Sequence, residues 1–275
     1  MAFLLAPALE GGSWAVCYSE RPTAGELAPF GLLVLDDRHH PPLEPLRAEG
    51  KTLLGYLSIG EVEKTRPYFA AARREGLLVE ENPDWKGSYR VDMRNRRWRW
   101  RVVNQIVPAL LRMGFHGVFL DTADVAGYLE EKDPKRFAGM RKAAVDLVRE
   151  IRKRHPAAKV MMNRGFDLLP ELAGELDAVL AESTRARYDF GGKVYRRTPD
   201  EEYRQAVNLL REAAQRFPSL TVYTLDYWDP DDALGVREIY REQRANGFAP
   251  YVSTILLDRV IAEPEAAPLD AEGLP

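Results

Sequence analysis

The chain has 275 residues, a length that suits either two average domains or one α/β barrel of about 250 residues. Lys and Arg number 39 against 42 Asp and Glu, and this balance disfavours a general nucleic-acid binder, which needs an excess of cations. A hydrophobic content of 45% excludes disordered, collagen-like and coiled-coil compositions. Cys17 is the only cysteine, so an internal disulfide and a structural zinc site that needs two or more cysteines are excluded.

Short apolar runs rich in β-branched and aromatic residues alternate with longer helical stretches, and such runs are typical of parallel strands covered on both faces. Eight strands are predicted, at 14–19, 30–36, 52–60, 117–121, 159–163, 178–182, 221–227 and 251–257. Helices are predicted at about 96–113, 135–155, 200–217 and 232–246, with shorter ones near 22–28, 43–49, 64–75 and 167–175. Eight such units predict an α/β fold, a (β/α)8 TIM barrel.

No linker or shift in composition divides the chain, so we predict a single barrel domain over 14–261, preceded by an N-terminal extension at 1–13. The Pro- and Ala-rich segment 262–275 is expected to be a flexible tail. Gly50, Gly114 and Gly247 each follow a helical stretch and precede a strand, as left-handed helix caps do. The loops 61–95 and 185–199 are too long to be plain connections, and the first has room for a short helix.

The first residues, MAFLLAPALEGG, are apolar but lack the basic segment that begins a signal peptide. No later run approaches the ~20 apolar residues of a membrane span. We therefore expect no membrane span, and a chain that is either cytosolic or the processed form of an exported protein.

Acidic side chains gather at the predicted carboxyl ends of the strands, where the active sites of (β/α)8 enzymes form. A single acid there can be a helix cap, but seven acids at the ends of five strands are too many for capping alone. They are Asp36, Glu61, Glu63, Asp121, Asp124, Glu182 and Asp226, with Asn163 at the end of another strand.

Carboxylates without His or Cys partners favour either a site for a hard cation or acid–base chemistry on a glycosidic bond. Hydrolysis of that bond needs two carboxyls, one to donate a proton and one to act as nucleophile or base. Asp121 and Glu182 fit by position, because each closes an apolar strand and would project from a rigid backbone. Their strands are two apart, about 10 Å between Cα atoms, which leaves retaining and inverting geometries open.

Sugar rings present C–H faces that stack on aromatic side chains. The two long loops and the end of the seventh strand supply such side chains at Trp85, Tyr89, Tyr188, Phe190, Tyr195, Tyr227 and Trp228. The predicted substrate-binding residues are Asp36, Tyr56, Glu61, Asp124, Asn163, Tyr188, Asp226, Tyr227 and Trp228.

The stretch MRNRRWRWRVV at 93–103 interleaves Arg with Trp, as a nucleic-acid patch would. We favour an amphipathic helix whose Trp and Val residues face the sheet, so no nucleic-acid partner is expected. His39 and His40 lie in a predicted turn and His116 precedes the fourth strand, so no metal role is expected for them. Cys17 lies in a strand and is expected to be buried and inert. Motifs for dinucleotides, phosphate loops and nucleophile elbows do not occur at strand ends.

Six segments together resemble glycoside hydrolase family 114, the endo-α-1,4-polygalactosaminidase barrels. They are YLSIGEVE (56–63), VDMRNRRW (91–98), GFHGVFLDTAD (114–124), MMNRGFDLL (161–169), AVLAEST (178–184) and LDYWD (225–229). The resemblance covers about 14–258 and implies hydrolysis of an α-1,4-linked galactosamine-containing polysaccharide, with the catalytic pair at Asp121 and Glu182. The chain departs from the family at His116, where members often have Asp, and in the missing export signal.

Three functions stay open at this point. The first is an endo-acting glycosidase without a cofactor, in which Asp121 is the nucleophile or stabilising carboxylate and Glu182 the general acid/base. Its acidic strand ends predict attraction of a cationic amino-sugar polymer. The second is a carbohydrate-binding barrel without turnover. The third is a hydrolase with a divalent ion at Asp121, Asp124 and Asp226, which the absence of a strand-end His disfavours.

Overall fold

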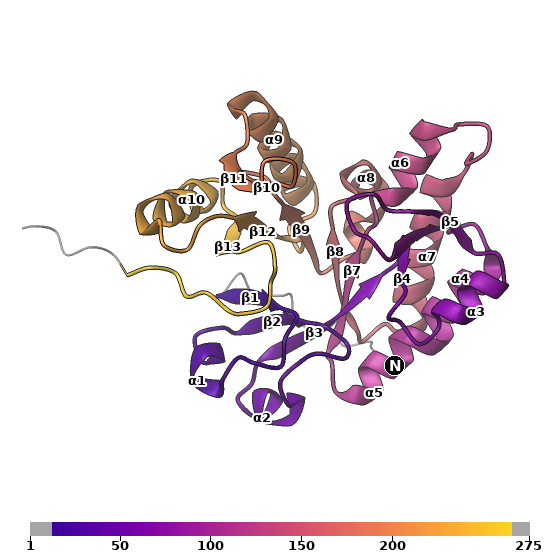
Figure 1. The fold of residues 1–275 in the computed structure, drawn as a ribbon, viewed down its shortest axis with the longest axis horizontal. Helices are drawn as coiled ribbons and strands as arrows, with labels where there is room; N and C mark the ends of the chain where they lie inside the picture. Colours follow the sequence, from indigo (N-terminus) through magenta and orange to yellow (C-terminus); the bar gives the residue numbers. More distant parts are fainter. Residues whose placement is uncertain (1–12, 266–275) are drawn as a thin grey trace, which may run out of the picture.

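The computed structural model describes residues 13–265, whose main strands form one nearly closed parallel barrel with helices around it (Figure 1). Their hydrogen-bonded order is β1-β2-β3-β7-β8-β9-β12-β13. The bounds are β1 Trp14–Cys17, β2 Leu32–Leu35, β3 Thr52–Ser58, β7 Gly117–Asp121, β8 Lys159–Asn163, β9 Ala178–Glu182, β12 Thr221–Tyr227 and β13 Ala249–Ser253. The predicted (β/α)8 barrel and its eight strands are confirmed, although the last strand begins and ends earlier than expected. Of the predicted extension at 1–13 only Ser13 is among the described residues, and of the predicted tail at 262–275 only 262–265 are.

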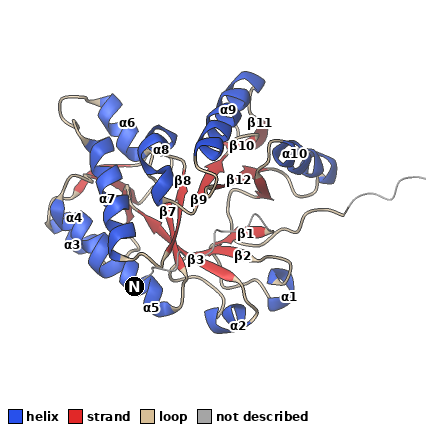
Figure 2. Cartoon of the chain, turned by 180° about the vertical axis from the view of Figure 1, so that it is seen from behind, coloured by secondary structure: helices blue, strands red, loops and turns tan. Residues whose placement is uncertain are grey.

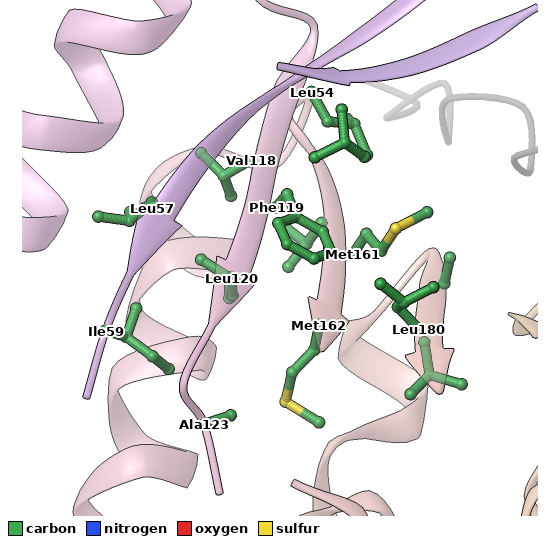
Figure 3. Packing of buried hydrophobic residues seen from close by; sticks show 14 of the residues in the cluster. Leu54, Leu57, Ile59, Val118, Phe119, Leu120, Ala123, Met161, Met162 and Leu180 are labelled. Carbon is green, nitrogen blue, oxygen red and sulfur yellow. The ribbon is translucent and has the colours of Figure 1, made fainter. Parts of the chain in front are cut away.

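The strands form where apolar side chains can be buried on both faces. All four residues of β1 and all four of β2 are buried. Figure 3 shows the alternation on β7, where Val118 and Leu120 point to one side of the strand and Phe119 to the other. Phe119 is in register with Met161 of β8, so large side chains fill the inside of the barrel as well as the layer under the helices.

Helices surround the strands (Figure 2). Their bounds are α1 Ala24–Leu27, α2 Leu43–Ala48, α3 Phe69–Arg74, α4 Arg96–Arg101, α5 Val107–Met113, α6 Val125–Lys132, α7 Met140–Arg154, α8 Leu169–Leu172, α9 Asp200–Arg216 and α10 Ala233–Ala245. The glycine caps predicted at Gly50, Gly114 and Gly247 all have positive φ, and α6 is a helix that the sequence did not predict. Within 13–265, none of the helices combines the length and the apolar character that crossing a membrane requires.

The predicted helix over 96–113 contains a π-helical segment, Val102–Ile106, between α4 and α5. Pro108 accounts for the irregular turn, because proline has no N–H to donate to the carbonyl one turn earlier. Trp98 is fully buried and donates its Nε1 hydrogen to the Ile59 carbonyl at 2.8 Å. Trp100 is 57% exposed, so the expectation that both tryptophans face the sheet is wrong for Trp100.

The two long loops hold β-structure that the sequence did not predict. After β3, the segment 61–95 carries the antiparallel sheet β4-β6-β5, with β4 Glu61–Glu63, β5 Leu78–Glu81 and β6 Ser88–Val91, beside the expected short helix α3. After β9, the segment 185–199 carries a hairpin of β10 Ala186–Asp189 and β11 Val194–Arg197. We call these segments the β3 excursion and the β9 excursion. Their strands are short and mix polar with apolar residues, so no apolar run marks them.

The barrel closes between its first and last strands through individual hydrogen bonds. Trp14 of β1 donates its Nε1 hydrogen to the Ala249 carbonyl of β13 at 3.0 Å. At the other end of the strands, the Tyr18 N–H donates to the Leu257 carbonyl at 2.7 Å. The Trp14 ring also packs edge-on against Tyr223, at 5.2 Å between ring centroids. We call this contact between β1 and β13 the seam.

Cys17 and His116 carry chemically reactive side chains, but both have structural roles. Cys17 is fully buried in β1, and burial raises the pKa of its thiol to about 11, which supports the expectation that it is inert. His116 lies at the amino end of β7, where its Nδ1 accepts a hydrogen bond from the Leu53 N–H at 3.0 Å.

We expect Gly117→Ala to lower the free energy of unfolding by about 1–3 kcal/mol, because a Cβ there would lie 2.0 Å from the Lys159 carbonyl oxygen and would force β7 from β8. Urea denaturation measures the loss. Gly174→Ala is the matched control, since its Cβ would meet only Phe217 at ordinary contact distance, 3.7 Å. Equal stability of the two variants would contradict the tight β7–β8 approach.

Candidate active site

A cleft of about 1180 Å³ opens at the carboxyl ends of the strands. It brings together both members of the predicted catalytic pair and most of the predicted substrate-binding residues. Those that line it are Asp121, Glu182, Asp36, Tyr56, Glu61, Asp124, Asn163, Tyr188 and Tyr227. The two excursions add walls to the cleft that the barrel alone would lack.

Asp121, Asn163 and Glu182 end the neighbouring strands β7, β8 and β9. The Asn163 Nδ2 donates to Asp121 Oδ1 at 2.9 Å and to Glu182 Oε2 at 2.7 Å. Since both oxygens bond to one nitrogen, they can be no farther apart than the sum of these two distances, 5.6 Å. The structure therefore places the two predicted carboxylates next to each other, with a buried amide between them.

A tyrosine hydroxyl donates to the remaining oxygen of each carboxylate. Tyr56 donates to Asp121 Oδ2 at 2.8 Å, and Tyr227 donates to Glu182 Oε1 at 2.7 Å. Burial and the neighbouring carboxylates raise the pKa of both phenols well above the usual value. Both tyrosines therefore stay protonated and keep donating over the range in which Asp121 ionises.

The pKa of Asp121 is raised, chiefly by burial and then by the negative charge of Glu182, while hydrogen bonds from Asn163, Tyr56 and the Thr122 backbone oppose the rise. The negative charge of Glu182 thus makes ionisation of Asp121 harder, and Asp121 keeps its proton to a higher pH than an exposed aspartate does.

The residue after each of these three strand ends has a left-handed backbone, with φ of 60° at Thr122, 57° at Arg164 and 59° at Ser183. Such φ values are uncommon for residues other than glycine and collect at functional sites. At Thr122 the conformation is fixed by its side chain, whose Oγ1 accepts a hydrogen from the Gly60 N–H at 2.9 Å. The sequence gives no signal for this shared turn, because none of the three residues is glycine.

Arg66 of the β3 excursion is a site residue that sequence reasoning missed. Its guanidinium pairs with Asp36 at 2.9 Å, with Glu63 at 3.1 Å and with Asp37, and it lies 5.3 Å from the Tyr56 ring centroid. Burial raises the pKa of Asp36, but Arg66 and two backbone N–H groups outweigh it, so the net shift is downward. This part of the cleft is consequently less negative than its carboxylates suggest.

Glu61 and Asp124 line the cleft but are already engaged by the protein. Glu61 is buried and accepts hydrogens from Ser88 at 2.7 Å and from Asn82 at 2.8 Å, so it ties β4 to the rest of its excursion. Burial raises its pKa. Asp124 lies 3.6 Å from the guanidinium of Arg164.

Asp226 and Trp228 lie outside the cleft, so we assign no substrate contact to them. Asp226 is fully buried and accepts hydrogens from the Arg185 and Ala186 N–H groups, at 2.7 and 2.9 Å, and from Gln243 of α10 at 2.6 Å. Trp228 donates its Nε1 hydrogen to Asp232 at 2.8 Å. The grouping of Asp121, Asp124 and Asp226 that a divalent ion would need is not formed. Among the described residues, no three His, Cys, Asp or Glu side chains come together in a metal-binding arrangement.

The barrel and its paired strand-end carboxylates define the class of protein as a glycosidase-type barrel, and comparison with known sequences identifies the family. A model of glycoside hydrolase family GH114 matches residues 5–266. The chain belongs to this family, and it is a glycosidase with a carbohydrate substrate.

Similar proteins cover nearly the whole chain. The glycoside hydrolase domain of PelA from Pseudomonas aeruginosa is 28% identical, with a TM-score of 0.81 over 91% of this chain and 98% of that one. Ega3 of Aspergillus fumigatus, whose crystal structure contains galactosamine, shares the fold at 14% identity, with a TM-score of 0.69 over 96% of this chain and 98% of its own. A protein of Deinococcus radiodurans is 27% identical over 252 residues, 88% of this chain and 78% of its own length.

The buried Asp226 makes stability depend on pH. Burial raises its pKa to about 6, above the value of about 3.9 for an unfolded Asp. Between these two values the folded state binds more protons than the unfolded state, so the free energy of unfolding falls as pH rises through this window. The shift of about two units corresponds to about 3 kcal/mol.

We expect Asp226→Asn to remove this pH-dependent fall in the free energy of unfolding, whereas the exposed control Asp231→Asn keeps it. Urea denaturation from pH 4 to pH 7 measures it, and parallel curves for wild type and Asp226→Asn would exclude the effect.

Proposed function

We propose that the protein hydrolyses an α-1,4-linked galactosamine-containing polysaccharide with retention of configuration, through the pair Asp121 and Glu182. The observation that carries this proposal is that Asn163 donates to one oxygen of each carboxylate, which keeps these two oxygens within 5.6 Å of each other. Retaining glycosidases hold their carboxyls about 5–5.5 Å apart, whereas inverting enzymes need about 6.5–9.5 Å to admit a water molecule. Membership of family GH114 and the similarity to PelA and Ega3 support the substrate class.

In this mechanism Glu182 donates a proton to the glycosidic oxygen while Asp121 attacks the anomeric carbon. The bond to the leaving sugar breaks and a glycosyl ester forms on Asp121. Glu182 then takes a proton from water, which attacks the same carbon and releases Asp121. We assign the nucleophile to Asp121 because three groups, Tyr56, Asn163 and the Thr122 backbone, donate hydrogen bonds to it, against two at Glu182. These bonds favour its anion and oppose the rise in pKa that burial causes.

Tyr56 and Tyr227 keep the two carboxylates in place during both steps. Each hydroxyl donates to the carboxylate oxygen that Asn163 does not contact. Neither Asp121 nor Glu182 can therefore rotate without losing a charge-assisted hydrogen bond. Asp121 must be ionised to attack, and its raised pKa moves that ionisation to a higher pH than for an exposed aspartate. Activity should therefore decline at low pH, where Asp121 is protonated and cannot attack.

We expect Asp121→Asn and Glu182→Gln to lower the rate by about 10²–10⁴, because the amides keep the shape of the site but cannot attack as an anion or transfer a proton. Substrates with a good leaving group should restore the first step in Glu182→Gln and not in Asp121→Asn, and NMR of the first product formed reports its anomeric configuration. Glu212→Gln, on the exposed face of α9, is the control. An inverted product would exclude the retaining mechanism. If Glu182→Gln binds the polysaccharide and wild type does not cleave it, the protein is a carbohydrate-binding barrel without turnover.

Charge should contribute to the choice of substrate. Seven carboxyl side chains line the cleft, Asp36, Glu61, Glu63, Asp84, Asp121, Asp124 and Glu182, against five Lys and Arg, Lys64, Arg66, Lys86, Arg90 and Arg164. We expect a several-fold higher kcat/KM on a polymer with free amino groups than on its fully acetylated form. The difference should shrink as salt screens the charges. Equal rates on both polymers at low salt would show that Arg66 and Arg164 cancel the field of the cleft.

A further inference from the structure

A second cavity of about 560 Å³ lies beside the cleft. Its walls come from α1 and the segment before it, the β9 excursion and the loop that follows β13. Three residues, Tyr188, Ile255 and Leu256, line both hollows and separate them. The second cavity is therefore continuous with the rim of the cleft, although it contributes nothing to the carboxylate pair.

A row of four aromatic rings leads from the cleft into the second cavity. Trp85 of the β3 excursion meets Phe190 of the β9 excursion, with 5.5 Å between ring centroids. Phe190 meets Tyr188 at 5.2 Å, and Tyr188 meets Tyr195 at 5.2 Å. Trp85 and Phe190 line the cleft, Tyr188 lines both hollows and Tyr195 lines the second cavity.

The row keeps apolar surface open to solvent. Trp85 is 52% exposed and Phe190 is 45% exposed. All three pairs meet edge to face, so ring faces are left that the neighbouring ring does not cover. Tyr188 and Tyr195 are half-buried and present to the second cavity the part of each ring that lines it. Aromatic surface arranged in a line is suited to the C–H faces of successive sugar units. Leu256, 71% exposed on the ridge between the hollows, extends this apolar surface.

The charge of the second cavity differs from that of the cleft. Its lining holds two cations, Arg21 and Arg259, and two anions, Glu26 and Asp258. Arg21 and Asp258 lie 3.7 Å apart. Because neither sign of charge is in excess, the second cavity would bind sugar units through stacking, and this binding would not depend on the charge of the sugar.

We propose that the second cavity is a distal subsite, which binds sugar units of the polysaccharide several positions from the bond that is cut, and that Tyr188 and Tyr195 are its stacking residues. The proposal rests on the proposed function, because it assumes that the chain in the cleft is a polysaccharide. It predicts that the enzyme gains affinity from substrate length, beyond the units that contact Asp121 and Glu182.

Tyr195 is the residue to change, because it lines the second cavity and not the cleft. We expect Tyr195→Ala to lower kcat/KM about fivefold or more on a long galactosamine oligomer, such as a decamer, and to leave a trimer unaffected, as expected for the loss of one aromatic contact. Tyr195→Phe keeps the ring and should restore the wild-type value. Trp100→Ala, a change at an exposed aromatic on α4 outside both hollows, should alter activity on neither substrate.

Binding to Glu182→Gln separates this inference from the proposed function. In calorimetry we expect the decamer to bind more tightly than the trimer, and Tyr195→Ala in the same background to remove that gain at low and high salt alike. No gain with length, or equal losses on both oligomers, would overturn the subsite. Failure of wild type to cleave any galactosamine oligomer would overturn the proposed function instead, and the binding measurements would still decide the subsite.

Discussion

A single amide group sets the geometry of the carboxylate pair. Asn163 ends β8, between the strands that carry Asp121 and Glu182, and spends both of its amide hydrogens on them. Its own Oδ1 is buried without a hydrogen-bond partner, a state that costs about 1–3 kcal/mol in proteins. An aspartate at the same place would repel both carboxylates, whereas the neutral amide donates a hydrogen to each of them and keeps the two acids side by side.

The barrel and its excursions have separate tasks. Strand ends supply the groups for chemistry, since their backbones are fixed by neighbouring strands on both sides. The excursions supply the walls and meet through Trp85 and Phe190 above the cleft. Arg66 links the two parts, because it comes from the β3 excursion and yet faces Asp36 at the end of β2 and the ring of Tyr56 on β3.

Much of this could be predicted from the sequence, and the limits have physical causes. Continuous apolar runs marked all eight barrel strands, and strand-terminal position singled out Asp121 and Glu182. The position of Asp226 near a strand end predicts a substrate-binding residue, and this prediction is wrong because side chains alternate along a strand. Leu225 and Tyr227 line the cleft, so Asp226 between them faces the helix layer and bonds to Gln243 of α10. Arg66 and the excursion strands lie in segments without periodicity, where only tertiary contacts decide position.

The seam gives the barrel unequal stiffness around its circumference. The strands that carry the carboxylate pair lie on the far side of the ring from it, where parallel ladders run without interruption. At the seam, one hydrogen bond joins Tyr18 to Leu257, two residues that line the cleft next to the ridge of Ile255 and Leu256. The Arg21–Asp258 pair, 3.7 Å apart, is a second link between the segments that follow β1 and β13, so outward displacement of that ridge would break isolated contacts and leave the ladders intact. The ring is therefore held less firmly at the seam than between the strands that carry Asp121 and Glu182.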